Sequence, residues 1–315
     1  MATASALTNT FSATGTAVKE QFADVLDVRF NEIATRKWAK PMQGLKFYKQ
    51  QNTSRAYEKY SSVTGLGLAR KARDVDPIPL TEKIQGFDVT ITPEEYKLGL
   101  QLGVRLLETD QFGVIDRHMA DLNQSMMDTV ELYAALPFNT AQDATVEWIC
   151  ADGMNLIDST RNREDGEGTW GNEETGAALS QSSIDTMRLN FRKNVSERGR
   201  VAPITMESII VPNDLQSSAN VYLDTKQKVG TAFNDDSVLN RYGLRLEVWD
   251  YLTSATRWFG MGPKDEKHEL YWLWAVKPGT VKYDVNNPDV YAYRSRMVFA
   301  TGCNRPHNIR GNAGA

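Results

Sequence analysis

The chain is poor in the residues with which proteins hold metals or form cross-linked scaffolds. Its 315 residues include two cysteines and three histidines. Cys150 and Cys303 lie far apart, which argues against a disulfide framework and indicates free, buried thiols. The histidines at positions 118, 268 and 307 lack the spacing of metal ligands. These scarcities argue against a metalloenzyme and against a disulfide-rich secreted scaffold.

Signature motifs of catalysis are missing as well. No CxxC pair, HExxH, GxSxG or P-loop occurs, and Gly65–Gly67 lacks the third glycine of a dinucleotide-binding loop. Cys303 lies near His307 but has no evident orienting acid that would make it a nucleophile. The acids between Asp158 and Glu174 do not follow the order of a calcium-binding EF-hand loop. We therefore expect no enzyme, no cofactor and no metal site.

Long apolar runs are also lacking. No stretch approaches the roughly 18 apolar residues of a membrane span. The first six residues carry neither the basic start nor the apolar block of a secretory signal, so we expect none. What is present is the composition of a folded chain, with 41% hydrophobic and 24% charged residues. The length allows one large domain or two ordinary ones.

Charge is distributed unevenly along the chain. Residues 1–73 hold twelve Lys or Arg and five Asp or Glu, whereas residues 74–315 hold 24 basic and 35 acidic residues. A basic N-terminal part joined to an acidic body suggests that the first meets an acidic surface, either another copy of the body or nucleic acid. The alternative is an ordinary solvated surface.

The pattern of apolar residues from Glu94 to Pro137 predicts a strand that leads into a very long helix. Alternating apolar residues predict the strand: Tyr96, Leu98, Leu100, Leu102 and Val104. A helical stripe follows, formed by Ile115, Met119, Leu122, Met126, Val130 and Tyr133. With Asp110 in its first turn and Pro137 as its stop, this helix would be roughly 40 Å long. We expect it to brace an extended subunit.

Two extensions precede this stretch. An amphipathic N-terminal helix places Phe22, Leu26 and Phe30 on its apolar side, and the polar stretch 40–59 separates it from the body. An alternating strand over 87–92 then closes a long two-stranded excursion. Its loop mixes both signs of charge: Arg70, Lys71, Arg73, Asp74, Asp76, Glu82 and Lys83. Such a loop suits contact with a partner, and the alternative is a mobile solvated loop.

The remaining predicted elements alternate between helices and strands. In chain order they are a short strand over 146–150, a helix capped at Ser182, a buried strand over 208–211 ended by Pro212, a helix capped at Asn213, and strands over 244–249, 270–276, 281–283 and 291–300. The long glycine- and acid-rich segment 158–176 is predicted as a loop. No internal repeat is present.

This order of elements resembles the major capsid proteins of tailed double-stranded DNA bacteriophages, which have the Hong Kong 97-type fold. The most specific local similarity is the segment Ile209–Leu215, an apolar strand followed by proline and an acidic helix start. The segment Tyr293–Gly302 is similar to the closing strand of that family. The resemblance implies an α+β fold divided as follows: 1–54 N-terminal arm, 55–93 E-loop hairpin, 94–145 P-domain strand and spine helix, 146–262 A-domain with an adjoining helix, and 263–315 return to the P-domain sheet and tail.

By the same resemblance, the chain would assemble as hexamers and pentamers into an icosahedral shell around phage DNA. The E-loop charges and the arm residues Phe22, Leu26 and Phe30 would contact neighbouring subunits, while the stripe from Ile115 to Tyr133 packs the spine helix. Expected partners are other copies of the chain, a separate scaffolding protein, a portal and, as an optional addition, a decoration protein. DNA would be enclosed without sequence-specific binding, no membrane is involved, and assembly would take place in the host cytoplasm. The alternatives are an encapsulin-like nanocompartment shell, another self-assembling virion component, or an α+β enzyme.

Overall fold

The computed structural model describes residues 42–69, 71, 73–74, 78, 80–109, 114–143, 148–225, 239–265, 268–283, 287 and 289–314. They form two compact units. Unit 1 is built from Glu94–Val130 and Val276–Phe299, and unit 2 from Gln43–Pro93, Glu131–Ala275 and Ala300–Ala315. Some predicted contact residues lie outside the described residues, namely Phe22, Leu26 and Phe30 of the N-terminal helix and Arg70 and Asp76 of the hairpin loop.

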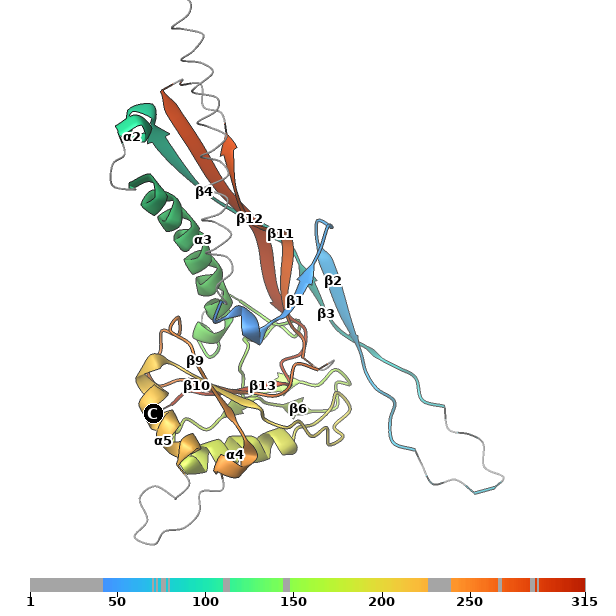
Figure 1. Cartoon of the computed structure of the whole chain (residues 1–315). Coiled ribbons are helices and arrows are strands. Elements are labelled where there is room, and N and C mark those ends of the chain that lie inside the picture. The colour runs from blue at the N-terminus through green and yellow to red at the C-terminus, as the bar shows by residue number, and fades with distance from the viewer. Residues whose placement is uncertain are drawn as a thin grey trace, which may run out of the picture. The chain divides into compact units, whose positions relative to one another are not determined.

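Unit 1 is a twisted antiparallel sheet covered by a helix. Strand β4 (Glu94–Gly103) pairs along its whole length with β12 (Val290–Cys303), and β11 (Leu270–Tyr283) lies on the other side of β12. Helix α3 (Val114–Asn139) begins in this unit and runs along the sheet (Figure 1). Because strand side chains alternate and helix side chains recur every three or four residues, each element offers one apolar face to the other. The core formed in this way consists of Leu102, Ile115, Met119, Leu122 and Tyr293, with Leu100 and Tyr291 against it.

The helical stripe predicted from the sequence is largely buried. Met119 and Val130 are fully buried, Ile115, Leu122 and Met126 nearly so, and Tyr133 is half-buried. The predicted strand is one residue too long, because Val104 begins the short helix α2 (Val104–Thr109). Leu98 points to the helix side by its register yet remains exposed.

The prediction that Pro137 stops the long helix is wrong. Helix α3 continues to Asn139, with Pro137 inside it. Proline lacks the N–H that would bond to the carbonyl four residues earlier, so the helix loses one hydrogen bond. The loss is confined to that single bond because the helix ends two residues later. Burial of Phe138, which is fully enclosed, offsets that loss. The predicted first-turn acid, Asp110, lies outside the described residues.

Unit 2 contains a five-stranded sheet in the order β7-β13-β10-β8-β9. The strands are β7 (Glu173–Glu174), β13 (Ile309–Asn312), β10 (Trp258–Met261), β8 (Ser208–Val211) and β9 (Arg245–Val248). Strand β10 is antiparallel to both β13 and β8, whereas β8–β9 and β13–β7 are parallel. Three consecutive buried residues of β8, Ile209 to Val211, fit a strand with cover on both faces.

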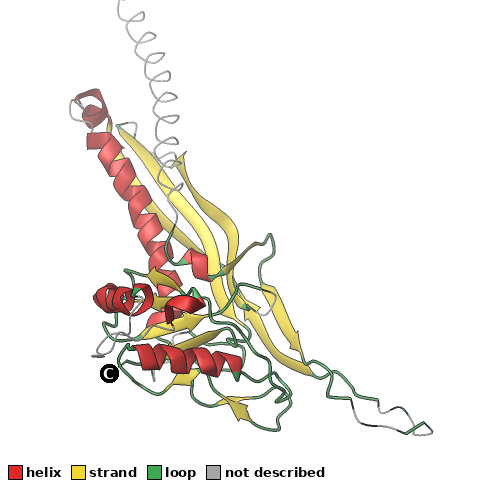
Figure 2. Cartoon of the chain, turned by 60° about the horizontal axis from the view of Figure 1, so that its bottom comes forward, coloured by secondary structure: helices red, strands yellow, loops and turns green. Residues whose placement is uncertain are grey.

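Two helices pack on this sheet, α4 (Gln181–Arg192) and α5 (Gln216–Asp224). Figure 2 shows helices in red and strands in yellow. Ile184, Met187 and Phe191 of α4 are fully buried, as their spacing predicts. Gly260 of β10 lets α4 approach closely, since a Cβ there would lie 2.6 Å from the Met187 sulfur. The rest of this core includes Leu179, Ile204, Met206, Ile209, Val211, Ala219, Leu223, Leu239 and Trp258.

Both predicted helix caps are shifted. The cap of α4 is Ser180, whose side chain accepts from the Ser183 backbone while the Ser183 hydroxyl accepts from the Ser180 N–H, which is a reciprocal capping box. Within the helix, Asp185 pairs with Arg188 at 3.0 Å. Asn213 does not cap a helix; it opens the 3-10 turn η2 (Asn213–Leu215), after which α5 begins.

The shorter elements also differ from the prediction in part. Trp148–Cys150, the described part of the predicted strand 146–150, is not a strand. The predicted loop 158–176 contains three two-residue strands, β5 (Arg161–Asn162), β6 (Thr169–Trp170) and β7. Strand β11 joins the two predicted strands over 270–283 into one, and its first part pairs in parallel with β1 (Lys49–Asn52) in unit 2. Two further 3-10 turns are η1 (Leu45–Phe47) and η3 (Leu239–Tyr242).

Candidate functional site

The predicted two-stranded excursion is a β-hairpin in unit 2. Strands β2 (Glu58–Val63) and β3 (Gln85–Ile91) are antiparallel, with Glu58 opposite Ile91 and Ser61 opposite Asp88. An irregularity in register follows Ser61. Lys59 Nζ lies 2.8 Å from Asp88 Oδ2 across the strands. The hydrogen bond from Lys59 is the main cause that lowers the pKa of Asp88 to about 2. One further backbone hydrogen bond, from the Thr64 N–H to the carbonyl of Ile84 at 2.9 Å, follows the ladder, and the described residues 65–69 and 80–83 lie beyond it.

The base of the hairpin is held on the rest of unit 2. Tyr60 stacks on Tyr271 of β11 with ring centroids 4.3 Å apart, next to the buried Leu273. The Ser62 hydroxyl donates to Glu164 Oε1 at 2.5 Å. Arg198 donates to the carbonyl of Glu82 at 2.6 Å, beyond the end of the ladder. An isolated hairpin is marginal in water, so these contacts with the body fix the direction in which the extension leaves it.

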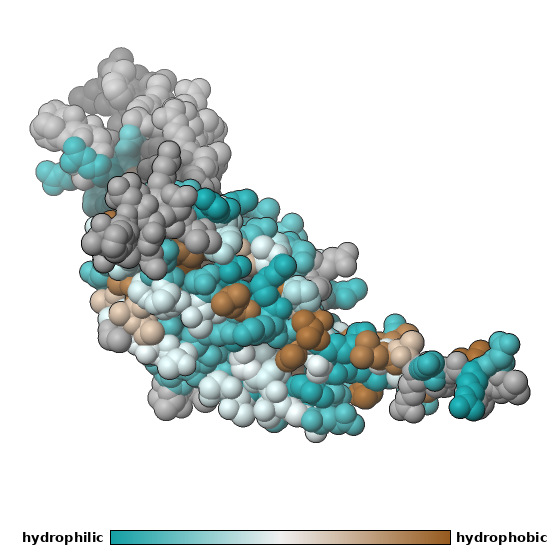
Figure 3. All heavy atoms as spheres, turned by 90° about the horizontal axis from the view of Figure 1, so that it is seen from below, coloured by the Kyte–Doolittle hydropathy of each residue, from teal (hydrophilic) through white to brown (hydrophobic). Residues whose placement is uncertain are grey.

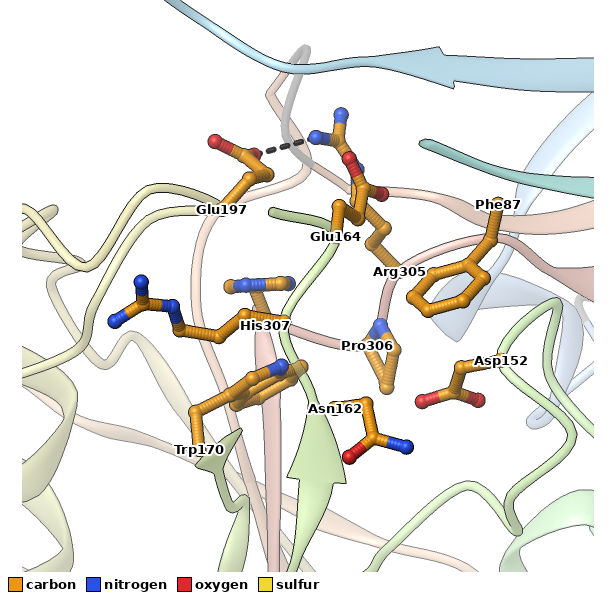
Figure 4. A pocket seen from close by; sticks show the side chains of 10 residues that line it. Phe87, Asp152, Asn162, Glu164, Trp170, Glu197, Arg305, Pro306 and His307 are labelled. Atoms are coloured by element: carbon orange, nitrogen blue, oxygen red, sulfur yellow. Dashed lines mark hydrogen bonds and ion pairs between the residues drawn. The ribbon is translucent and has the colours of Figure 1, made fainter. Parts of the chain in front are cut away.

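A small pocket lies under this base and is lined by Phe87 of β3 together with the loops around Glu164 and Arg305 (Figure 4). Arg305 binds Glu269 Oε1 at 2.5 Å and also pairs with Glu197, so its charge is compensated. Burial raises the pKa of Glu164. The floor is a stack of His307 on Trp170, with ring centroids 3.9 Å apart. The pocket is a tightly packed, charge-paired support for the hairpin.

The extension beyond the hairpin carries four large aliphatic side chains that are exposed to solvent. The exposed fractions are 51% for Leu66, 76% for Leu68, 83% for Ile78 and 92% for Leu80. We call these four residues the apolar extension; apolar side chains gather along this part of the surface in Figure 3. Exposed aliphatic residues are unremarkable singly, but a group of them on one projecting segment marks an interaction site.

The predicted contact charges lie on the same segment. The described ones, Lys71, Arg73, Asp74, Glu82 and Lys83, are all exposed. The structure therefore brings these five together with the apolar extension, whereas the sequence-based prediction considered the charges alone. The sequence does contain a signal for an apolar contact surface. Leu66 and Leu68 are separated by one residue, as are Ile78 and Leu80, which is the spacing of strands that bury one face.

The segment that leads in from the N-terminal region is anchored in unit 2. Leu45, Phe47 and Tyr48 are buried, and the Tyr48 hydroxyl donates to the carbonyl of Ala134 at 2.6 Å. Gly44 lies so close to α3 that a Cβ would be 2.8 Å from the Ala134 side chain, and it would also be 2.5 Å from the Trp249 ring. The expectation that the polar stretch 40–59 separates the N-terminal helix from the body is therefore wrong, because Leu45, Phe47 and Tyr48 pack into unit 2 although their spacing in the sequence shows no regular period.

A buried carboxylate holds this anchor. Glu131 Oε2 accepts from the Gly44 backbone at 2.8 Å and from Trp249 Nε1 at 3.2 Å. Its Oε1 is buried and has no hydrogen-bond partner among the described residues. Burial raises the pKa of Glu131 above its ordinary value of 4.5, because the surroundings disfavour the charged form more than the donors stabilise it.

This raised pKa makes the anchor's stability depend on pH. The contribution of Glu131 to the free energy of unfolding is fully present below pH 4.5 and is lost as pH rises through the raised folded-state pKa. We expect the free energy of unfolding of the wild type, minus that of Glu131→Gln, to increase as the pH is lowered from 7 towards 4. Urea unfolding at several pH values measures it, with the exposed Glu207→Gln as matched control. A difference that stays constant, or falls, would show this assignment to be wrong.

The residues that could have carried catalysis are placed unsuitably for it. Cys303 is fully buried, and burial raises the pKa of its thiol well above the ordinary range. Burial also lowers the pKa of His307 to about 3 and that of His268 to about 4, so neither is poised near neutral pH. His118 is exposed on α3. Across the described ranges, no group of three or more His, Cys, Asp or Glu could hold a metal ion.

Among the described residues, no helix combines the length and the apolar character needed to cross a bilayer. The hairpin with its apolar extension is the exposed candidate surface, and it is suited to contacts with another protein chain. The segment Gly44–Tyr48 is largely buried and anchors the chain within unit 2.

Comparison with known proteins supports this interpretation. A family model described as phage capsid protein matches residues 87–310. A chain in the structure of Microbacterium phage Oxtober96 superposes with a TM-score of 0.55 at 8% identity, over 88% of this chain and 93% of that one. A chain of the capsid of the cyanophage P-SCSP1u gives 0.56 at 8% identity over 85% and 86%, and one of the mature capsid of bacteriophage PhiM1 gives 0.55 at 10% over 88% of each. No curated protein sequence matches the chain.

Proposed function

The chain belongs to the phage capsid protein family, and from this premise we propose that it assembles as hexamers and pentamers into an icosahedral head that encloses double-stranded DNA. The chain is a structural component of a phage virion and not an enzyme. Its fold is that of phage capsid chains, the α+β Hong Kong 97-type fold that the sequence resembles. The proposal concerns the geometry of assembly, as hexamers and pentamers in an icosahedral head, and the double-stranded DNA that the head encloses.

The observation that carries this proposal is the apolar extension. Four exposed aliphatic residues on one projecting segment are unfavourable in water and become favourable when another surface covers them, at about 25 cal/mol per Å² of buried apolar area. The surrounding charges of both signs add specificity and orientation to such a contact more than affinity. Repeated contacts between unlike surfaces form closed shells when the rotation between neighbours permits closure.

The roles of the other segments follow from the same proposal. We assign residues 55–93 to the E-loop, 94–145 to the P-domain strand and spine helix, 146–262 to the A-domain, and 263–315 to the return and tail. Residues 1–54 would form the arm, with Phe22, Leu26 and Phe30 against a neighbouring subunit. The anchor at Gly44–Tyr48 supports this, because a segment that reaches a neighbour needs a fixed point on its own subunit. The proposed partners are a separate scaffolding protein, a portal and an optional decoration protein, with assembly in the host cytoplasm.

Sedimentation of the expressed chain tests the proposal. The chain is produced alone and together with the genes that flank it, and the lysate is treated with nuclease before centrifugation. The proposal expects particles far larger than a small oligomer and, where packaging genes are present, nuclease-resistant double-stranded DNA inside them. Only monomers or small oligomers under both conditions would refute the assembly proposal. Large particles that enclose protein and exclude DNA even with packaging genes would refute the genome-enclosing part.

A further inference from the structure

The two cysteines, distant in the sequence, meet in the interior of unit 2. Cys303 ends β12 and Cys150 lies in the segment that follows α3; their exposed fractions are 0% and 2%. The Ala151 N–H donates to the carbonyl of Cys303 at 3.0 Å, so the two backbones are direct neighbours. Both thiols are free in the structure.

The backbone contact limits the distance between the two Cα atoms. Adding the covalent lengths on either side of the Ala151–Cys303 hydrogen bond keeps them within roughly 8 Å of each other. A disulfide needs Cα atoms about 4.4–6.8 Å apart, which lies inside this limit. Burial raises the pKa of Cys303, and the neighbouring Cys150 thiol raises it further, which agrees with two thiols that lie close together.

A buried cation lies beside the pair. Arg161 is fully buried, binds Asp152 at 2.6 Å, and interacts electrostatically with both sulfur atoms. A neighbouring guanidinium stabilises a thiolate once one forms. Because Cys150 directly follows the exposed Ile149, an oxidant reaches Cys150 before Cys303 when this segment opens locally.

We propose that Cys150 and Cys303 form an intramolecular disulfide when the chain meets a small disulfide oxidant. The Cys150 thiolate attacks the external disulfide and releases one thiolate, which gives a mixed disulfide. The Cys303 thiolate then attacks the Cys150 sulfur and releases the second one. The two cysteine protons pass to the two released thiolates, so the external disulfide is reduced to two thiols and the protein thiols are oxidised.

The bond would close a loop that contains both helices α4 and α5 and the strands β8, β9 and β10. A cross-link around a loop of this length restricts the unfolded chain strongly. The free thiols suit the reducing interior of a cell, and the disulfide suits a particle outside it. The inference goes beyond the proposed function, since it concerns the chemistry of the single chain.

Mass spectrometry of the full chain after incubation with oxidised glutathione tests this proposal. We expect a mass loss of two hydrogens and a link between the Cys150 and Cys303 peptides that a reducing agent breaks. We also expect a rise in Tm of roughly 5–15 °C. Cys150→Ala and Cys303→Ala should each lose the rise, with every variant compared with its own reduced form so that packing effects cancel.

Several outcomes would overturn the proposal. They are two thiols that still react with N-ethylmaleimide after oxidation and unfolding, a product that stops at one glutathione adduct, or a link between two different chains. A disulfide that forms without any rise in Tm would refute its stabilising role. None of these results depends on whether shells form, so a failure here is distinguishable from a failure of the assembly proposal.

Discussion

Replacing Leu68 and Leu80 together by aspartate is expected to lower the assembled fraction at least tenfold while leaving the isolated subunit as stable as the wild type. Both side chains are largely exposed in the single chain, so aspartate costs little there. When a contact between subunits buries it, each leucine stabilises that contact by about 1.5–3 kcal/mol. An aspartate buried there without a partner would destabilise the contact by more than the leucine stabilised it. Since about 1.4 kcal/mol changes an equilibrium tenfold, the loss at a single contact suffices, and a shell repeats that contact many times.

The matched control for this substitution is Leu68→Met with Leu80→Met, which keeps the apolar character and approximate size of both side chains. We expect the methionine variant to assemble like the wild type. Sedimentation gives the assembled fraction and urea unfolding the stability of the subunit. Normal shells from the aspartate variant would show that the apolar extension does not mediate assembly, whereas an unfolded subunit would show that these side chains pack within their own chain.

The largest expected loss of stability comes from Phe138→Ala, at about 3–5 kcal/mol. Phe138 is fully buried at the end of α3, and its ring lies 6.2 Å from Phe47, 5.3 Å from Trp249 and 5.2 Å from Phe259, measured between ring centroids. Its removal leaves a cavity and removes one of the aromatic rings that pack against Phe47 of the anchored N-terminal segment. Urea or thermal unfolding measures the effect.

Leu132→Ala on the same helix is the control, because 59% of that side chain is exposed. We expect it to change the free energy of unfolding by less than about 0.5 kcal/mol. Equal effects of the two substitutions would contradict the packing described for the end of α3. If Phe138→Ala also abolished assembly under conditions where the subunit is folded, the anchored segment would be implicated in the contact between subunits.

Periodic segments were predictable from the sequence, because a regular pattern of burial produces a regular pattern of residues. The alternation from Tyr96 to Leu102 and the stripe from Ile115 to Val130 give β4 and α3, whose facing sides form the core of unit 1. The hairpin was predictable for the same reason, from the strand over 87–92 and its loop. The ends of these elements were harder to predict, because Val104 continues the alternating pattern of β4 but belongs to α2.

Local signals failed where a tertiary contact, or a competing pair of nearby side chains, decided between two possibilities. Proline normally ends a helix, yet burial of Phe138 continues α3 past Pro137. Ser182 is the cap of α4 predicted from the sequence, whereas Ser180 caps this helix because Ser183 completes the reciprocal pair. The continuation of α3 past Pro137 cannot be read from residues within one turn of the helix, whereas the Ser180–Ser183 pair is itself local.

The candidate site was predictable only in part. The charges of the hairpin loop stand out in a sequence, whereas the contacts that support the hairpin join residues about a hundred positions apart, such as Ser62 and Glu164. The anchor of Gly44 on Glu131 is hidden in the same way, because an isolated glutamate looks like a surface residue until its partners are known. Long-range pairs of this kind leave no period in the sequence.

The most direct test of the account is a cryo-electron microscopy reconstruction of the particles that the chain forms with its flanking genes. The account predicts closed shells in which residues 64–84 of each subunit lie against a neighbouring subunit and the side chains of Leu68 and Leu80 lose their exposure to solvent. Shells in which the apolar extension projects freely into solvent would contradict the central claim, as would the recovery of only a small, uniform oligomer.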